Sequence, residues 1–324
     1  MRILITGGCG FIGSHLAEYL LERGERVEVL DDLSSGSLKN VFGIKKHPNF
    51  SCVIGSVLDY QLSEKIVRRN DFIFHLAAAV GVKMVIEDPI KSIKINVGGT
   101  ENILELASRF KKKVLLTSTS EVYGKNEKIP FSENSDSLFG STKIRRWNYA
   151  CTKLLDEFMS FAYFQEKKLP VIVVRLFNTI GPRQTGEYGM VVPRFIRQAL
   201  GGKPITVYGD GKQVRCFTYV TDVIEAMISL TKEPAAFGDI FNVGNPTTAI
   251  TINELAKVIK KLTKSKSKII HISYQKAYQQ GFADMERRVP DIGKIQKQID
   301  FFPKINLKEA LPRIIEYHKN IISS

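Results

Sequence analysis

Short apolar runs recur along the chain, and stretches with the spacing of amphipathic helices separate most of them. The runs are typical of strands buried on both faces of a parallel sheet. They fall at residues 3–5, 27–30, 50–54, 72–76, 114–117, 171–176 and 240–243. Helical spacing covers residues 92–110 and 147–165, among others. Strands that alternate with helices predict an α/β fold with a doubly wound parallel sheet, whose ligands bind beyond the carboxyl ends of the strands.

The first strand runs directly into a glycine-rich turn that leads into a helical pattern. The turn contains Gly7, Gly8, Gly10 and Gly13. Glycine lets the backbone approach a phosphate closely, and the free N–H groups and positive dipole end of the following helix favour that phosphate. Asp31 ends the second strand, and an acidic residue there accepts hydrogen bonds from the adenosine ribose and repels a 2′-phosphate. The pattern predicts a dinucleotide site that prefers NAD to NADP.

A second pattern joins a hydroxyl cluster to a tyrosine and a lysine. Thr119 lies at the end of the fifth apolar run, and Tyr149 and Lys153 are four residues apart, so both face the same way on a helix. An ammonium group and a nicotinamide cation beside the phenol favour the phenolate, which lowers the tyrosine pKa from its usual value of about 10. We therefore expect Tyr149 to act as a general base, with Thr119 bonded to the same substrate hydroxyl.

Composition limits the class of protein. The 324 residues, 44% of them hydrophobic, suffice for one large or two ordinary soluble domains. The four cysteines lack metal-ligand spacing, no apolar run is long enough to cross a membrane, and no secretory signal precedes the first strand. These features predict a cytoplasmic protein with reduced thiols.

The net charge of +14 leaves several kinds of partner open, including nucleic acid, an anionic membrane and an anionic small substrate. The lysines are spread along the chain and are densest over residues 257–276, without an interleaved aromatic platform. We interpret that stretch as a solvated surface, and we expect no nucleic acid or membrane partner.

The motifs together resemble those of the extended short-chain dehydrogenases/reductases, the family of NAD-dependent nucleotide-sugar epimerases, dehydratases and decarboxylases. The matching stretches cover almost the whole chain. They are TGGCGFIG at 6–13, HLAAA at 75–79, TSTSEVYG at 117–124, YACTK at 149–153, RLFNTIGPR at 175–183, VYGDGKQVRCFTYVTDV at 207–223, FNVGNP at 241–246 and ERRVPDI at 286–292. The resemblance implies a Rossmann sheet with a smaller, discontinuous C-terminal lobe that binds the substrate.

The resemblance also assigns the cofactor residues. It implies that the glycines cradle the pyrophosphate and that Asp31 holds the adenosine ribose. Lys153, a candidate catalytic residue, is expected to orient the nicotinamide ribose and to tune Tyr149. The candidate NAD-binding residues are Gly7, Gly10, Phe11, Ile12, Gly13, Asp31, Ala77 and Lys153. One position departs from the family, because Ser56 stands where relatives usually have an aspartate that contacts adenine.

The second half of the chain is expected to hold a nucleotide-diphosphate sugar, UDP-linked in our reading. The resemblance points to Asn178, Arg215 and Arg288, and guanidinium groups suit phosphates. We divide the chain into a Rossmann domain, residues 1–177 plus about 239–263, and a substrate lobe, residues 178–238 plus 264–324. A homodimer through the helices at 92–110 and 147–165 is expected from the resemblance.

The resemblance implies that Tyr149 removes the proton of the sugar 4-hydroxyl, with Thr119 polarising that hydroxyl, to give a 4-keto sugar. Glu121, also a candidate catalytic residue, bears on the next step, because dehydratases and UDP-glucuronate decarboxylases carry glutamate there and simple 4-epimerases do not. Arg146-Trp147 and Arg288 resemble the decarboxylase branch.

The leading prediction is therefore a UDP-glucuronate decarboxylase. The alternatives are a 4-epimerase acting on UDP-glucose or UDP-glucuronate, a 4,6-dehydratase of the GDP-mannose type and, from a different class, a non-catalytic protein that binds NAD and RNA.

Overall fold

The computed structural model describes residues 1–186, 189–277 and 285–323. Its centre is a seven-stranded sheet with the strand order β11-β6-β5-β4-β1-β2-β3, in which every neighbouring pair is parallel. The strands are β1 (Arg2–Thr6), β2 (Arg26–Asp31), β3 (Phe50–Ile54), β4 (Phe72–His75), β5 (Lys113–Thr119), β6 (Val171–Leu176) and β11 (Ile240–Val243). The seven predicted strands and the doubly wound sheet are confirmed.

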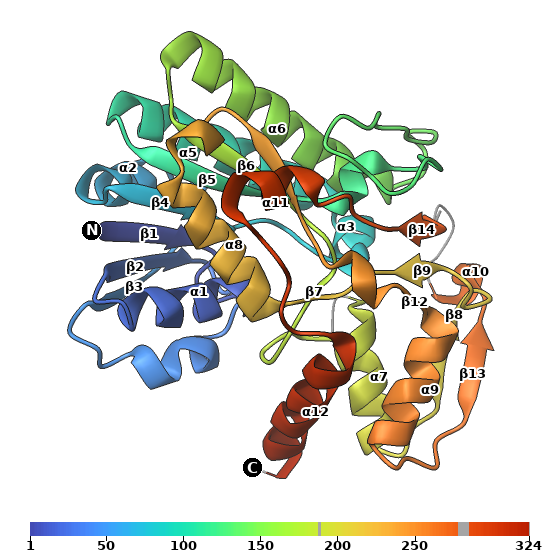
Figure 1. Ribbon diagram of the computed structural model, residues 1–324. Helices are drawn as coiled ribbons and strands as arrows, with labels where there is room; N and C mark the ends of the chain where they lie inside the picture. The colour runs from blue at the N-terminus through green and yellow to red at the C-terminus, as the bar shows by residue number, and fades with distance from the viewer. Residues whose placement is uncertain (187–188, 278–284, 324) are drawn as a thin grey trace.

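Helices cover both faces of this sheet, which explains why its strands are mostly apolar (Figure 1). In β1, Ile3 and Ile5 join a core cluster with α1 (Phe11–Leu21) and α8 (Val220–Lys232). Leu4, between them, points to the other face and joins the cluster of α2 (Tyr60–Arg69) and α5 (Gly99–Arg109). Alternate side chains of one strand thus enter two different cores.

The long helical stretches begin and end close to the predicted positions. The predicted helix at 147–165 is α6 (Trp147–Lys167). The stretch at 92–110 contains the end of α4 (Pro89–Ile93), a π-helical turn, η2 (Lys94–Gly98), and α5. Asn96 in the π-helical turn accepts a hydrogen bond from the Ala79 backbone N–H at 2.7 Å and donates one to the Thr152 hydroxyl at 3.0 Å. The π-helical turn therefore ties the loop after β4 to α6.

Small sheets and helices form a second lobe beside the carboxyl edge of the large sheet (Figure 1). The sheets pair β7 (Thr179–Ile180) with β10 (Thr218–Tyr219), β8 (Ile205–Tyr208) with β13 (Ile269–Ile272), and β9 (Val214–Arg215) with β12 (Ile250–Thr251) and β14 (Arg287–Arg288). The remaining helices are α3 (Val82–Glu87), α7 (Val191–Leu200), α9 (Ile252–Leu262), α10 (Tyr274–Ala277), α11 (Gly293–Ile299) and α12 (Leu307–Ser323).

The contacts of α8 and α9 favour a boundary that differs from the predicted one, although the division into two lobes stays a prediction. α8, which the division gave to the substrate lobe, packs against α1 and β6. α9, which it gave to the Rossmann domain, packs against α7 and β8. No proline- or glycine-rich linker marks either crossing in the sequence.

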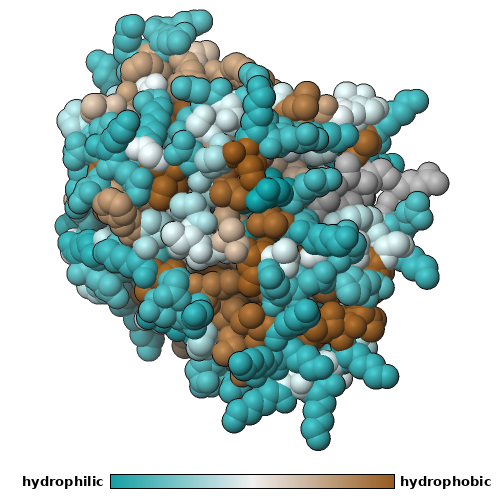
Figure 2. Space-filling model, turned by 45° about the vertical axis from the view of Figure 1, so that its right-hand side comes forward, coloured by the Kyte–Doolittle hydropathy of each residue, from teal (hydrophilic) through white to brown (hydrophobic). Residues whose placement is uncertain are grey.

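The basic stretch near residue 257 is the outer face of α9. The helix begins with a capping box between Thr251 and Glu254 and buries Ile252, Leu255, Ala256 and Ile259. Lys257 and Lys261 are exposed on the same helix. On the face seen in Figure 2, hydrophilic side chains form the periphery and apolar side chains show in a band through the middle. Over the described residues, no helix is both long and apolar enough to cross a membrane.

Candidate functional site

Two adjoining pockets lie beyond the carboxyl ends of the strands. The glycine pocket, about 560 Å³, is lined by the turn after β1, the end of β2 and the loop at 33–37. The tyrosine pocket, about 310 Å³, is lined by the ends of β5 and β6, by Tyr149 and by residues of the second lobe. Five residues line both pockets: Leu76, Ala78, Val80, Gln184 and Met190. The two cavities therefore meet above β4.

The turn in the glycine pocket has room only for glycine. Gly7 has φ +71°, and a Cβ atom there would lie 2.9 Å from the Ala77 nitrogen. A Cβ on Gly13 would collide with the backbone of Gly7 and lie 2.7 Å from the Gly8 Cα. Helix α1 begins at Phe11 without a side-chain cap, so its first N–H groups are oriented toward a ligand of this pocket.

The predicted cofactor residues lie together here, with one exception. The pocket is lined by Gly7, Gly10, Phe11, Ile12, Gly13, Asp31 and Ala77. Asp31 is 7% exposed, and burial raises the pKa of its carboxyl group. Its two oxygens accept hydrogen bonds from the backbone N–H groups of Cys9, at 2.9 Å, and Leu33, at 2.8 Å. Asp31 thus braces the glycine turn against the loop after β2.

Lys153, the exception, lies one helical turn below Tyr149 and is almost fully buried. Its Nζ is 2.7 Å from Oδ2 of Asp156, and the two side chains are 3% and 0% exposed. Burial and the Lys153 charge lower the pKa of nearby His75 to about 3. The ammonium group is therefore compensated by a carboxylate three residues along α6.

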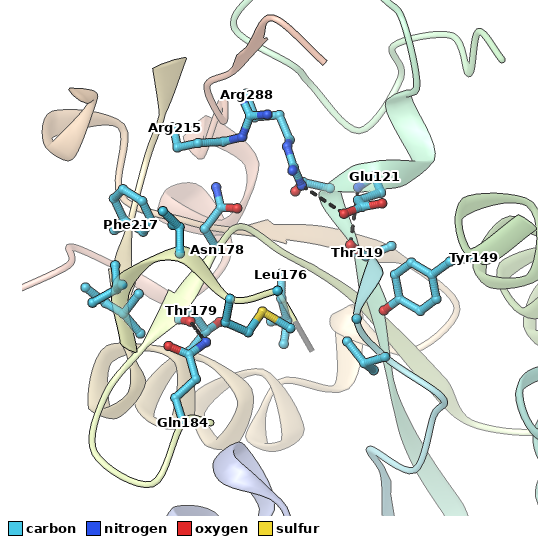
Figure 3. Close-up of a pocket in the computed structure, with 18 of the residues that line it drawn as sticks. Thr119, Glu121, Tyr149, Leu176, Asn178, Thr179, Gln184, Arg215, Phe217 and Arg288 are labelled. Carbon is cyan, nitrogen blue, oxygen red and sulfur yellow. Dashed lines mark hydrogen bonds and ion pairs between the residues drawn. The ribbon is translucent and has the colours of Figure 1, made fainter. Parts of the chain in front are cut away.

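Tyr149 is the third residue of α6, and Figure 3 shows its phenol directed toward the strand that carries Thr119. Desolvation raises the pKa of Tyr149, and the carboxylates of Glu121 and Asp156 raise it further. A hydrogen bond to the Thr119 side chain and the Arg288 charge act in the opposite direction. The predicted lowering of the pKa is therefore wrong for the protein alone, because burial and two carboxylates outweigh the Thr119 hydrogen bond and the Arg288 charge.

Glu121 lies between two buried arginines. Its Oε1 is 3.5 Å from Nη2 of Arg146 and 3.3 Å from Nη1 of Arg288, and its backbone N–H donates to the Thr119 hydroxyl at 3.2 Å. Figure 3 shows Glu121 and Arg288 facing one another across the top of the pocket. Glu121 thereby connects the hydroxyl cluster of β5 to β14 of the second lobe.

Asn178 and Arg215 line the wall that faces the second lobe. Asn178 donates to the Cys216 carbonyl at 2.8 Å. Arg215 is 5% exposed and pairs in register with Arg288 on the neighbouring strand. The six predicted residues Thr119, Glu121, Tyr149, Asn178, Arg215 and Arg288 all line this one pocket.

Sequence reasoning did not select several residues of the same wall. They are Arg194, Tyr208, Gln213, Phe217 and Tyr274. Arg194 stacks on Tyr208 at 3.7 Å, and Gln213 donates to the Tyr274 hydroxyl at 3.0 Å. The family-like stretch at 207–223, which supplied Arg215, also contains three of these five residues. Across the described residues, no group of histidine, cysteine or acidic side chains has the arrangement of a metal site.

Comparison with known proteins places this site in a family. The model of the GDP-mannose 4,6-dehydratase family matches residues 4–314. The chain belongs to this family. The resemblance to extended short-chain dehydrogenases/reductases is therefore confirmed, and with it the class of nucleotide-sugar enzymes.

Three similar proteins narrow the comparison. UDP-N-acetyl-alpha-D-glucosaminuronate decarboxylase of Bacillus cytotoxicus is 44% identical over 99% of this chain and 98% of its own length. UDP-glucuronic acid decarboxylase 1 of Arabidopsis thaliana is 37% identical over 99% of this chain and 71% of its own length. The structure of UDP-glucuronic acid 4-epimerase from Bacillus cereus, with UDP-glucuronic acid and NAD, has a TM-score of 0.89 and 27% identity over 99% of this chain and 100% of that one.

Proposed function

We propose that the protein is an NAD-dependent decarboxylase of a UDP-linked hexuronate that works through a 4-keto intermediate. The charge of the tyrosine pocket is the observation that carries this proposal. Among its described lining residues are four arginines, Arg146, Arg194, Arg215 and Arg288, and one acid, Glu121, a net charge of plus three. A UDP-hexuronate brings negative charge on both phosphates and on C6, whereas a UDP-hexose lacks the C6 charge. Complementary charge favours the hexuronate.

The glycine pocket fits NAD. Only glycine is accommodated at Gly7 and Gly13, and the N-terminus of α1 faces the space where a pyrophosphate would lie. Asp31, at the end of β2, lines the same pocket at the place of the adenosine ribose. When bound there, NAD supplies the hydride acceptor for C4 of the sugar.

The residues of the tyrosine pocket divide the remaining work. Tyr149 takes the proton of the 4-hydroxyl, and Thr119 bonds to the same oxygen. A ketone at C4 makes the C6 carboxylate that of a β-keto acid, so the electron pair of the C5–C6 bond passes toward the ketone as carbon dioxide leaves. Arg288 binds the carboxylate, and Glu121, the one carboxyl group among the described lining residues, gives a proton to C5 after taking one up from solvent. Tyr149 then gives its proton back to the C4 oxygen as the hydride returns to C4.

The nucleotide lies on the opposite wall in this proposal. Arg215 and Asn178 hold the diphosphate, and the aromatic residues Tyr208, Phe217 and Tyr274 provide faces for the base. Lys153 orients the nicotinamide ribose once its ammonium group is shared between that ribose and Asp156.

An assay with a panel of sugars tests the reaction. Protein and NAD are incubated separately with UDP-glucuronate, UDP-N-acetylglucosaminuronate, UDP-glucose and GDP-mannose. The masses of the products are measured by mass spectrometry. We expect loss of carbon dioxide from at least one of the two hexuronates. A new isomer of unchanged mass, or loss of water from GDP-mannose, without any loss of carbon dioxide would instead identify a 4-epimerase or a dehydratase.

We also propose a homodimer through α4 and α6. Ile90, Ile93, Leu155 and Phe158 are large apolar side chains on these helices, and they are 67%, 45%, 46% and 65% exposed. The two helices pack against each other, so these side chains belong to neighbouring surfaces. Apolar side chains at this density are typical of an interface. Sedimentation of the wild type as a monomer at micromolar concentration would contradict the dimer.

The cytoplasmic location stays a prediction.

A further inference from the structure

Two cysteines far apart in the sequence meet directly behind the glycine turn. Cys9 is the fourth residue of the motif TGGCGFIG, and Cys52 lies in β3 at the edge of the sheet. Their sulfur atoms are 3.6 Å apart. Cys52 pairs in register with Val29 of β2, so the sheet itself holds it at this position.

The two thiols differ in access. Cys9 is 0% exposed, whereas Cys52 is half-buried on the edge strand. The Cys9 hydrogen bond and the Lys45 charge favour the Cys52 thiolate, against burial and the Asp31 carboxylate, and the net effect lowers the pKa of Cys52. Burial raises the pKa of Cys151, and it raises that of Cys216 to about 12. Cys52 is therefore the one of the four cysteines whose surroundings favour a reactive thiolate.

Cys9 is also part of the framework of the glycine pocket. Its N–H donates to Asp31, and its carbonyl accepts hydrogen bonds from the Ser37 N–H at 3.0 Å and the Asn40 side chain at 2.9 Å. Asp31, Ser37 and Asn40 all line the pocket. A displacement of Cys9 is therefore transmitted to three groups that face the ligand.

We propose that Cys52 is an oxidative modification site, and that its reaction with hydrogen peroxide leads to a disulfide with Cys9 that weakens NAD binding. The Cys52 thiolate attacks the peroxide, the O–O bond breaks, and Cys52 becomes a sulfenic acid while hydroxide leaves. The Cys9 sulfur then attacks the Cys52 sulfur, and the S–O bond of the sulfenic acid breaks. The leaving oxygen takes up the proton of the Cys9 thiol and departs as water. In sum, two thiols lose two electrons and two protons to the peroxide, which becomes two molecules of water.

Formation of the Cys9–Cys52 disulfide requires a change in the geometry of the glycine pocket. A disulfide bond is about 2.05 Å long, so the sulfur atoms must approach by more than an ångström. Cys52 is fixed by the parallel pairing of β3 with β2, so we expect most of the approach to come from the Cys9 side. That movement lengthens or breaks the hydrogen bonds of Cys9 to Asp31, Ser37 and Asn40. If NAD binds the reduced protein more tightly, it stabilises the reduced form. Each tenfold difference in NAD affinity therefore raises the reduction potential of the disulfide by about 30 mV when NAD is bound.

The test uses the whole, fully reduced protein treated with hydrogen peroxide in the absence of NAD. Intact mass lower by two hydrogen atoms, a peptide cross-link between residues 9 and 52, and reversal by dithiothreitol are expected. Calorimetric titration should show NAD binding at least about tenfold weaker in the oxidised protein. Bound NAD should slow the cross-link.

Variants separate this site from general oxidation. Cys52→Ser should bind NAD normally and form no cross-link, and Cys52→Ala repeats the test if the serine variant is unstable. Cys151→Ser is the matched control, because Cys151 is exposed, and it should cross-link like the wild type. Oxidation that modifies Cys151 and leaves the pair as thiols, or a cross-link with unchanged NAD affinity, overturns the proposal. The inference takes NAD as the ligand from the proposed function, but the cross-link is measured without any sugar, so a failed decarboxylase assay would leave it standing.

Discussion

The glycine pocket and the tyrosine pocket share a wall and are built in opposite ways. Backbone makes the phosphate end of the first, because the three glycines of the turn and the N-terminus of α1 face it within one strand–turn–helix unit. Side chains make the second, because Thr119, Glu121, Tyr149, Asn178, Arg215 and Arg288 come from distant parts of the chain. A backbone site tolerates few residue types, whereas a side-chain site depends on the placement of charged groups from separate elements.

The contrast between the two pockets predicts that turnover depends most on the phenol oxygen of Tyr149. Tyr149→Phe removes the phenol oxygen that takes the proton and leaves the ring in place. We expect turnover to fall by about 10³-fold, within the range for loss of a general base. Calorimetry should find NAD binding unchanged, because Tyr149 does not line the glycine pocket. Turnover within about tenfold of the wild type would remove Tyr149 from the mechanism.

In the glycine pocket, a single methyl group should be decisive. The Cβ of Gly13→Ala would collide with the backbone of Gly7, so we expect NAD affinity to fall by about 100-fold or more. Gly43→Ala is the matched control, because its Cβ would have no neighbour within 4 Å. Calorimetric titration of both variants compares them directly. Wild-type affinity in Gly13→Ala would show that the turn is not a rigid cradle.

Charge in the tyrosine pocket should matter for hexuronates in particular. Arg288→Met removes a guanidinium group from Glu121 and from the proposed carboxylate site, and we expect kcat/KM to fall by about 30- to 100-fold, as for a lost charged hydrogen bond. Its neighbour Arg287 is exposed, so Arg287→Met should retain activity. Equal losses in the two variants would contradict a specific role for Arg288.

The smallest expected effect is a displacement of the pH profile. The Asp156 carboxylate raises the pKa of Tyr149, so Asp156→Asn should lower that pKa. The base form of Tyr149 then persists to lower pH, and the acidic limb of kcat/KM moves to lower pH. Glu166→Gln removes the same charge from an exposed position of α6 and should leave the limb in place. Movement to higher pH in Asp156→Asn would contradict the assigned electrostatics.

These contrasts also explain how far the sequence could be interpreted. The glycine turn and Asp31 belong to local sequence patterns, so their positions at the ends of β1 and β2 could be predicted from the sequence. The hydrogen bond between Arg288 and Glu121 joins residues 167 positions apart, and only the fold brings them together. The burial of Tyr149 was not visible in the sequence, and this burial, followed by the carboxylates of Glu121 and Asp156, raises the pKa that we expected to be lowered. The predicted lobe boundary left no compositional trace, because no proline- or glycine-rich linker marks it in the sequence.

The pairing of β9 with β14 has one more consequence. Arg215 and Arg288 occupy opposite positions on these strands, and the Val214 N–H donates to the Glu286 carbonyl at 2.8 Å alongside them. In the proposed complex, Arg215 binds the diphosphate and Arg288 binds the carboxylate at C6 of the sugar. The pairing of the two strands fixes the relative positions of the two Cα atoms that carry these guanidinium groups. A one-residue slip of β14 against β9 would therefore displace the proposed carboxylate site from the proposed diphosphate site.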